Sequence, residues 1–239
     1  MILVPSTVQT QINGASVSIT CDTSYPSSNT LSYTITSTGP FTLSIRIPSW
    51  ASSNSTVSFD SSPSNRKPLT TDANSIFTTP IHKGVTHLII NLSTSIRVVS
   101  KPNNAVAIYY GALLYALSTP YTITSTAPLN WTDRTPLPDT TTDPRSMDHF
   151  ITPNDPNFWS IAIDPSQLVF HSGAEEGEIW INATASKIEW AVVGDTPDLP
   201  PSAPVVVGDP FVVRLVPFGK AKLHMAELPA MSLAKVNGL

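Results

Sequence analysis

Few residues of this chain have the types and spacing that an active site requires. Glycoside hydrolysis needs two carboxyl groups, one as the acid and one as the base or nucleophile. The side chains that could supply such a pair are Asp155, Asp164, Glu178, Glu189 and Asp209. Most stand at predicted turns or strand ends, where Asp is favoured because it hydrogen-bonds the local backbone. Because the sequence also lacks a G-x-S-x-G nucleophile elbow, we favour a chain without catalytic residues of its own.

Metal ligands are equally sparse. Cys21 is the only cysteine, so a cysteine-based zinc site cannot form within this chain. It continues the apolar face of Ala15, Val17 and Ile19, and is expected in the core as a small hydrophobic residue. The five histidines show no ligand spacing such as H-x-x-x-H: His82, His87, His149, His171 and His224. We therefore expect this chain to bind no metal or other cofactor.

Aromatic rings offer a different chemistry, because they can stack on sugar rings. Trp50 follows the strand-ending Pro48, and Trp131 lies in a long polar segment, so both are predicted to be accessible. Trp159 and Trp190 fall within strand patterns and are expected in the core. Carbohydrate contact through Trp50 or Trp131 is the binding hypothesis that these residues support.

Four N-x-[ST] sequons mark candidate N-glycosylation sites at Asn54, Asn91, Asn130 and Asn182. Sequons arise easily by chance in a chain so rich in Ser and Thr. Charged residues make up 13% of the chain, against roughly 25% in an average soluble domain, which suits an extracellular protein. Met1–Pro5 lacks the basic and apolar regions of a secretory signal. We expect a secreted parent protein whose N-terminal portion is absent here.

Charge and hydropathy disfavour two kinds of partner. The net charge is −4, and the 13 Lys and Arg residues form no basic cluster that could neutralise a nucleic-acid backbone. No apolar run reaches the roughly 18 residues of a membrane-spanning helix. The longest run, Ala105–Leu117, is interrupted by Gly111 and is predicted to be a buried strand. Neither a nucleic acid nor a membrane is an expected partner.

Alternation of apolar and polar residues predicts an all-β fold. Val8–Ile12 and Ala15–Ile19 flank Asn13-Gly14, the preferred pair of a two-residue type I′ hairpin. That turn places Ile12 opposite Ala15, Thr10 opposite Val17 and Val8 opposite Ile19. Leu31–Ile35 and Phe41–Ile47 alternate in the same way, and the 23 prolines disfavour helices. Residues 125–156 are rich in Pro, Thr and Asp and are expected to be a long loop with little regular structure.

Several segments resemble the β-sandwich region of glycoside hydrolase family 127, the β-L-arabinofuranosidase-like proteins. Thr23-Ser24-Tyr25-Pro26 and the R-I-P-S-W-A run at 46–51 carry the most specific resemblance. Three further segments follow in the family's order: the strand at 106–117, the closing strand at 213–219 and residues 222–229, whose sequence is most like the fungal branch of the family. The chain departs from the family at Ser27, where an aromatic often stands, and at Ala112, where the family has Pro; both changes bear on packing.

The resemblance implies a parent with an (α/α)6 barrel followed by two β-sandwiches. In that family the barrel holds the chemistry: a cysteine nucleophile on a zinc bound by cysteines and a glutamate, with another glutamate as acid/base. None of those motifs occurs here, so no catalytic residue is carried over. We therefore expect two consecutive antiparallel, jelly-roll-like β-sandwich domains, at residues 1–118 and 119–239, and the missing catalytic barrel as a partner in cis.

The leading functional hypothesis is a non-catalytic accessory region of a secreted hydrolase acting on plant-type arabinofuranosides. One alternative is a stand-alone carbohydrate-binding module that uses Trp50 or Trp131. Another is an enzyme in its own right, with a carboxylate pair.

Overall fold

The computed structural model describes residues 3–59, 65–138, 142–175, 177–194 and 196–237. Within these ranges the chain is built of β-strands and short 3-10 turns, among them η2 (Pro144–Ser146) and η3 (Phe218–Lys220), and it contains no α-helix. The all-β prediction is confirmed. None of the described segments is a helix with the length and hydrophobicity that crossing a bilayer needs.

Contacts divide the chain into two compact units, and neither unit is continuous in sequence. The first comprises residues 1–99, 107–115 and 168–181, and the second residues 100–106, 116–167 and 182–239. The sequence-based domain boundary near residue 118 stays a prediction.

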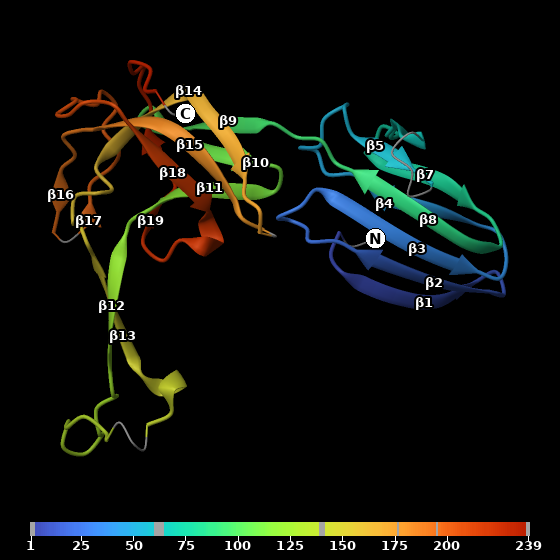
Figure 1. The fold of residues 1–239 in the computed structure, drawn as a ribbon, viewed down its shortest axis with the longest axis horizontal. Coiled ribbons are helices and arrows are strands. Elements are labelled where there is room, and N and C mark those ends of the chain that lie inside the picture. Colours follow the sequence, from blue (N-terminus) through green and yellow to red (C-terminus); the bar gives the residue numbers. More distant parts are fainter. Residues whose placement is uncertain (1–2, 60–64, 139–141, 176, 195, 238–239) are drawn as a thin grey trace. The chain divides into compact units, whose positions relative to one another are not determined.

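The first unit contains a six-stranded sheet and a separate pair of strands (Figure 1). Figure 1 shows the blue strands β1, β2 and β3 side by side, with β8 next to β3. In sheet order the strands are β1 (Ser6–Ile12), β2 (Ala15–Asp22), β3 (Thr30–Ser37), β8 (Gly84–Asn91), β5 (Thr56–Ser58) and β6 (Lys67–Pro68). The separate pair is β4 (Phe41–Arg46) with β7 (Ile76–Ile81).

The first hairpin has the predicted register. Ile12 pairs with Ala15, Thr10 with Val17, and Val8 with Ile19. Asn13 and Gly14 have φ values of 49° and 82°, the positive pair that a type I′ turn requires. The turn chemistry and the strand pairing therefore agree.

The core of the first unit lies between its two sheets. Leu31, Tyr33 and Ile35 point inward from β3, while Leu43 and Ile45 point inward from β4, and all are buried. Alternation along each strand produces this arrangement, because successive side chains of a strand face opposite sides. Two facing apolar surfaces make the unit a β-sandwich, as predicted. Cys21 lies in this core, where burial raises the pKa of its thiol.

A second large sheet has eight strands, which lie between residues 96 and 229. Its main path runs β14 (Ile161–Ser172), β15 (Ile179–Lys187), β18 (Phe211–Pro217), β11 (Leu113–Ser118), β10 (Ala105–Tyr110) and β20 (Leu228–Pro229). Two further strands join at the side: β9 (Ile96–Lys101) pairs with β10, and β19 (His224–Met225) pairs with β11. A short hairpin, β16 (Val192–Val193) with β17 (Thr196–Pro197), stands apart.

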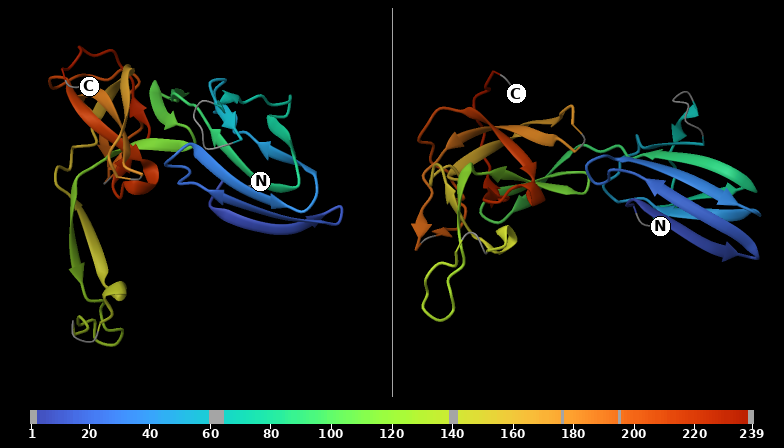
Figure 2. Two further views of the ribbon diagram at one scale, coloured as in Figure 1. Left: turned by 45° about the vertical axis from the view of Figure 1, so that its right-hand side comes forward. Right: turned by 60° about the horizontal axis from the view of Figure 1, so that its bottom comes forward.

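Residues 125–153 differ from the expected loop. β12 (Tyr121–Thr126) pairs along its whole length with β13 (Asp148–Pro153), and the two form an antiparallel ribbon that leaves the second unit as an arm (Figures 1 and 2). The expected lack of regular structure was therefore wrong at both ends of 125–156. Apolar and polar residues do not alternate regularly along these two strands, because nearly all side chains of the ribbon are exposed and neither face is selected for apolar residues.

Candidate functional site

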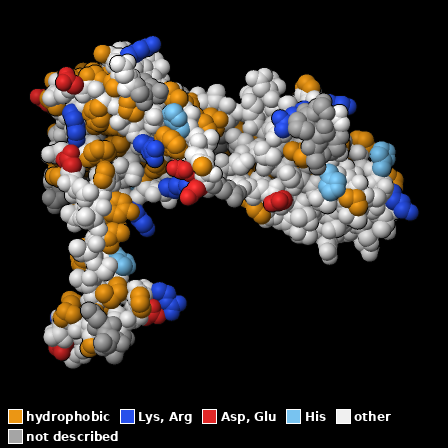
Figure 3. All heavy atoms as spheres, viewed as in Figure 1, with side chains coloured by type: hydrophobic (Ala, Val, Ile, Leu, Met, Phe, Trp, Pro, Cys, Tyr) orange, Lys and Arg blue, Asp and Glu red, His pale blue; other side chains and the backbone are white. Residues whose placement is uncertain are grey.

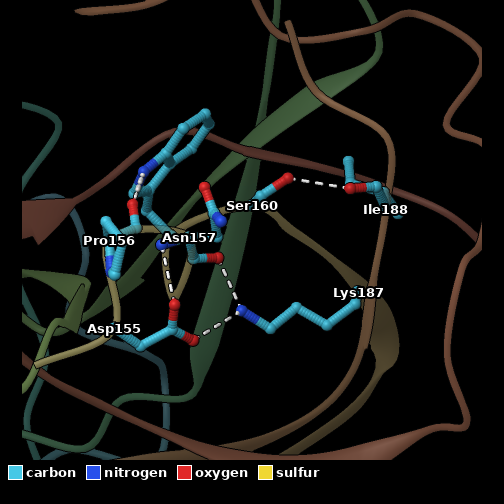
Figure 4. A network of polar contacts seen from close by, with 7 residues as sticks. Asp155, Pro156, Asn157, Ser160, Lys187 and Ile188 are labelled. Carbon is cyan, nitrogen blue, oxygen red and sulfur yellow. Dashed lines mark hydrogen bonds and ion pairs between the residues drawn. The ribbon is translucent and has the colours of Figure 1, made fainter. Parts of the chain in front are cut away.

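A polar cluster in the second unit, between the loop after β13 and the end of β15, borders a groove (Figure 4). The Lys187 ammonium lies 3.3 Å from Oδ2 of Asp155 and also donates to the backbone carbonyl of Asn157. Oδ1 of Asp155 accepts a hydrogen bond of 2.8 Å from the Asn157 backbone N–H. One lysine thus fixes both the carboxylate and the loop that carries it.

A groove of about 530 Å³ opens beside this cluster. The residues that line it come from three segments of the second unit that are far apart in sequence: Asp155, Asn157, Ser160, Lys187, Ile188, Trp190 and Val207. A volume of this order accommodates one or two sugar-sized rings in typical ligand sites, which run from about 300 Å³ upward.

Backbone contacts hold the walls of the groove in place. Ser160 Oγ donates to the carbonyl of Ile188 at 2.8 Å, and the Ile188 N–H donates to the carbonyl of Ser160 at 3.1 Å. Val207 N–H donates to the Lys187 carbonyl at 2.9 Å on the other side. The groove is therefore formed before any ligand arrives.

Trp190 lines this groove and packs against Trp159. Their rings pack edge to face, with centroids 5.2 Å apart and planes at 73°. Each indole N–H is used internally, by the carbonyl of Pro156 at 2.6 Å and that of Asp198 at 2.9 Å. Both rings are half-buried, so the prediction of core positions was wrong: β14 begins after Trp159 and β15 ends before Trp190.

The electrostatics of the cluster keep Asp155 ionised. The Asn157 N–H, aided by the nearby Lys187, holds the pKa of this carboxyl below its usual value. A carboxylate beside an ammonium provides strong hydrogen-bonding groups with little net charge. Sequence reasoning missed Lys187 and Asn157, although D-P-N at a strand end is a turn signal that could have indicated them.

Trp50, one of the two predicted sugar platforms, lies in the first unit and is half-buried against its core. Its ring stacks on Tyr25, with centroids 6.5 Å apart and planes at 11°. The two motifs that carry the most specific family resemblance therefore contact each other. Trp50 also lines a shallow pocket of about 360 Å³ with Leu3 and Arg46. Most of this indole serves packing, and little of it remains for a ligand.

Trp131, the other predicted platform, lies near the tip of the arm and is 85% exposed. The Arg134 guanidinium lies 5.4 Å from its ring centroid. The tip is ordered by its own backbone: Asn130 N–H donates to the Thr135 carbonyl at 2.7 Å, and Asp133 accepts from both the N–H and the hydroxyl of Thr135. Trp131 is thus accessible to a ligand or to another protein surface.

The carboxylates considered for catalysis have different surroundings. Asp155 pairs with Lys187, and Asp164 is buried among hydrogen-bond donors. Glu178, Glu189 and Asp209 are exposed. Among the described residues, no group of three or more His, Cys, Asp or Glu is placed to hold a metal ion.

The four sequons are not equally accessible in the folded chain. Asn54 is exposed, and the side chain of Asn130 caps its own turn by accepting from the Thr132 N–H at 2.9 Å. Nδ2 of Asn91, the atom to which a glycan would attach, is buried. In the Asn182 sequon, the hydroxyl of Thr184 is buried and donates to Gln167.

Comparisons with known proteins support the family resemblance. Residues 1–72 match the sequence family described as beta-L-arabinofuranosidase, GH127 middle domain. No curated protein matches the chain in sequence.

Solved structures match nearly the whole chain in fold. Ara127N-Se, a GH127 beta-L-arabinofuranosidase from Geobacillus stearothermophilus T6, is 17% identical with a TM-score of 0.59, covering 96% of this chain and 33% of that one. The GH127 beta-arabinofuranosidase BT3674 is 15% identical with a TM-score of 0.61, covering 96% and 34%. A structure described as a glycoside hydrolase is 15% identical with a TM-score of 0.59, covering 95% and 34%.

The chain thus spans about a third of the length of the solved structures that it matches. The predicted resemblance is confirmed at two levels, by the sequence match over residues 1–72 and by the shared fold over most of the chain. Residues 1–72 are thus similar in sequence to the GH127 middle domain, and the chain shares the fold of about a third of each of those structures.

Proposed function

We propose that this chain is the non-catalytic accessory region of a secreted family 127-like hydrolase that acts on plant-type arabinofuranosides. The observation that carries the proposal is the match in fold: 96% of this chain corresponds to only 33% of a GH127 beta-L-arabinofuranosidase. The middle-domain match at residues 1–72 supports it. In this proposal the remaining two thirds of such a protein supply the catalytic domain.

The inventory of side chains supports a division of labour between the two parts. Zinc bound by several cysteines needs more thiolates than Cys21 alone can supply. Asp164, the buried candidate carboxylate, is saturated by hydrogen bonds from its own unit. Zinc and the catalytic carboxylates therefore belong to the barrel in this proposal, and this chain covers and braces one face of it.

The arm supports a packing role. It exposes large apolar side chains on both faces and at its tip, where hydrophobic groups appear in orange in Figure 3: Ile123, Leu129, Trp131, Leu137 and Phe150. A second exposed group, from the segment around β16 and β17, consists of Val192, Val193, Leu199, Val205 and Val206. Exposed apolar clusters of this kind mark surfaces that another domain or protein covers. We propose the barrel as that partner.

The experiment that tests this proposal starts from the gene. The reading frame upstream of Met1 is determined from genomic and transcript sequence, and the joined protein is produced. Hydrogen exchange is then compared between the joined protein and this chain. Slower exchange at 121–153 or 192–206 in the joined protein is the expected result. A frame that encodes no helical domain, or exchange that is unchanged in both segments, would refute the packing role.

A further inference from the structure

We infer that the groove between the 155–160 loop and the end of β15 is a binding site for a neutral sugar. The site belongs to the second unit alone, so the inference does not depend on the barrel. Trp190 and Val207 form its apolar side, and Asp155, Asn157 and Lys187 form its polar side. Figure 4 shows the polar side, with the side chains of Asp155 and Lys187 directed toward each other.

The apolar side suits the face of a sugar ring. A sugar presents C–H groups on one face and hydroxyls at its edge, and aromatic rings stack on the C–H face. Trp190 is held by its N–H bond to the Asp198 carbonyl and by its edge-to-face contact with Trp159. Because the indole is already fixed, stacking a ligand on it costs little conformational entropy.

The polar side suits hydroxyl groups. The Asp155 carboxylate can accept from two hydroxyls, and the Lys187 ammonium can donate to a third. The carboxamide of Asn157 is exposed, and it can both donate and accept. Mixed donors and acceptors within one groove match the alternating hydroxyls of a sugar better than they match an amine or a hydrocarbon.

Charge balance selects a neutral ligand. Asp155 and Lys187 lie 3.3 Å apart and largely cancel each other's field at the groove. An acidic sugar would meet the carboxylate of Asp155 in a chain whose net charge is −4. We therefore expect arabinans and other neutral glycans to bind, and polyuronates not to bind.

The groove is also built in advance. Reciprocal hydrogen bonds between Ser160 and Ile188 hold its base, and the hydrogen bond from Val207 to Lys187 holds one of its sides. Ser186 Oγ adds a bond of 2.6 Å to the Gly208 carbonyl just below this hydrogen bond. Ligand sites in proteins are usually largely pre-formed in this way.

Binding can be tested on the purified chain by isothermal titration with arabino-oligosaccharides and by gel retardation in arabinan and polygalacturonate. Dissociation constants in the millimolar range or tighter are expected with the arabino-oligosaccharides, with retardation by arabinan only. Trp190→Ala should weaken binding at least tenfold, and Asn157→Ala severalfold. Asn157 is exposed and its side chain makes no bond among those described, so its variant reports on binding while folding stays intact.

Phe150→Ala is the control, since it removes an exposed aromatic ring of the arm that does not line the groove, and it should leave affinity unchanged. Thermal unfolding of each variant shows whether it is folded. The inference is overturned if the chain binds no neutral glycan, or if polygalacturonate retards it as strongly as arabinan does. It is equally overturned if Trp190→Ala and Asn157→Ala bind the arabino-oligosaccharides as tightly as the parent chain does. The same holds if Trp190→Ala alters the self-association of the chain but not its affinity for the glycan. None of these results would alter the accessory role, which rests on the fold match.

Discussion

The backbone N–H of Leu233 donates a hydrogen bond of 2.9 Å to Oδ2 of Asp164, and so ties the C-terminal segment to strand β14. Gln167 completes the tie, since its Nε2 donates to Asp164 and to the Leu233 carbonyl, each at 2.8 Å. Ser166 donates to Oδ1 through both its N–H and its hydroxyl. Asp164 is only 4% exposed, and every bond it makes is structural.

Replacing Asp164 by Asn should destabilise the fold by about 1–3 kcal/mol. The variant amide can still accept from Ser166, but its NH2 group would face the donors of Leu233 and Gln167. Urea unfolding measures the difference. The exposed Asp209→Asn is the matched control and should change stability by less than about 0.5 kcal/mol. Equal effects of the two substitutions would show that the hydrogen bonds of Asp164 contribute nothing to the free energy of unfolding.

The same carboxyl makes stability depend on pH. Burial alone would raise the pKa of Asp164, but hydrogen bonds from Ser166, Leu233 and Gln167 outweigh it and hold the pKa below its usual value. As the pH falls, the Asp164 carboxyl is therefore protonated in the unfolded chain before it is protonated in the folded chain, at about pH 3.9. The contribution of Asp164 to stability is complete above that pH and is lost as the pH falls through the folded pKa.

The free energy of unfolding is therefore expected to fall more steeply between pH 5 and pH 2 in the parent chain than in Asp164→Asn. Other Asp residues contribute to both slopes, and the comparison isolates this one. Denaturant unfolding at a series of pH values measures it. Identical slopes would refute the assignment.

Gly14 offers a test of the first hairpin. Its φ is +82° and a Cβ added there would meet nothing within 4 Å, so only backbone strain opposes a side chain. Gly14→Ala should cost about 1 kcal/mol in the free energy of unfolding. Gly219 also has open space around it but has no positive φ, so Gly219→Ala should be neutral or slightly stabilising. The prediction fails if both substitutions have the same effect.

Removing apolar side chains from the arm should improve the behaviour of the chain in solution. Trp131 is 85% exposed and Phe150 is 58% exposed, so the double change Trp131→Ser and Phe150→Ser loses little packing. Binding of the dye ANS and self-association by light scattering should both fall, with stability within about 0.5 kcal/mol. Thr124→Ser, opposite Phe150, is the control. Unchanged dye binding would show that the arm is not the exposed apolar surface.

The sequence predicted the parts of the fold that local patterns encode. Asn13-Gly14 specified both a turn and a register, and the alternation along β3 and β4 identified the residues of the first core. The strand β13 and its pairing with β12 were missed because a ribbon exposed on both faces carries no alternating apolar signal. The pairing of β10 with β20 joins residues more than a hundred positions apart, and local propensity does not encode such a contact.

The candidate site was the least predictable feature. Trp190 and Lys187 lie near each other in sequence, but Asp155 and Val207 reach the same groove through separate segments of the chain. Trp159 and Trp190 looked like strand residues because each stands next to a strand end. Asp164 looked like a catalytic candidate because burial and hydrogen bonding are visible only in the folded chain.

Hydrolysis of an aryl β-L-arabinofuranoside by the purified chain, with and without added zinc, tests the central claim most directly. An accessory region should release no aryl alcohol above the rate of the buffer alone, at any protein concentration and with either metal condition. Turnover that rises in proportion to protein, and that is abolished by one substitution at Asp155, Asp164, Glu178, Glu189 or Asp209, would contradict it.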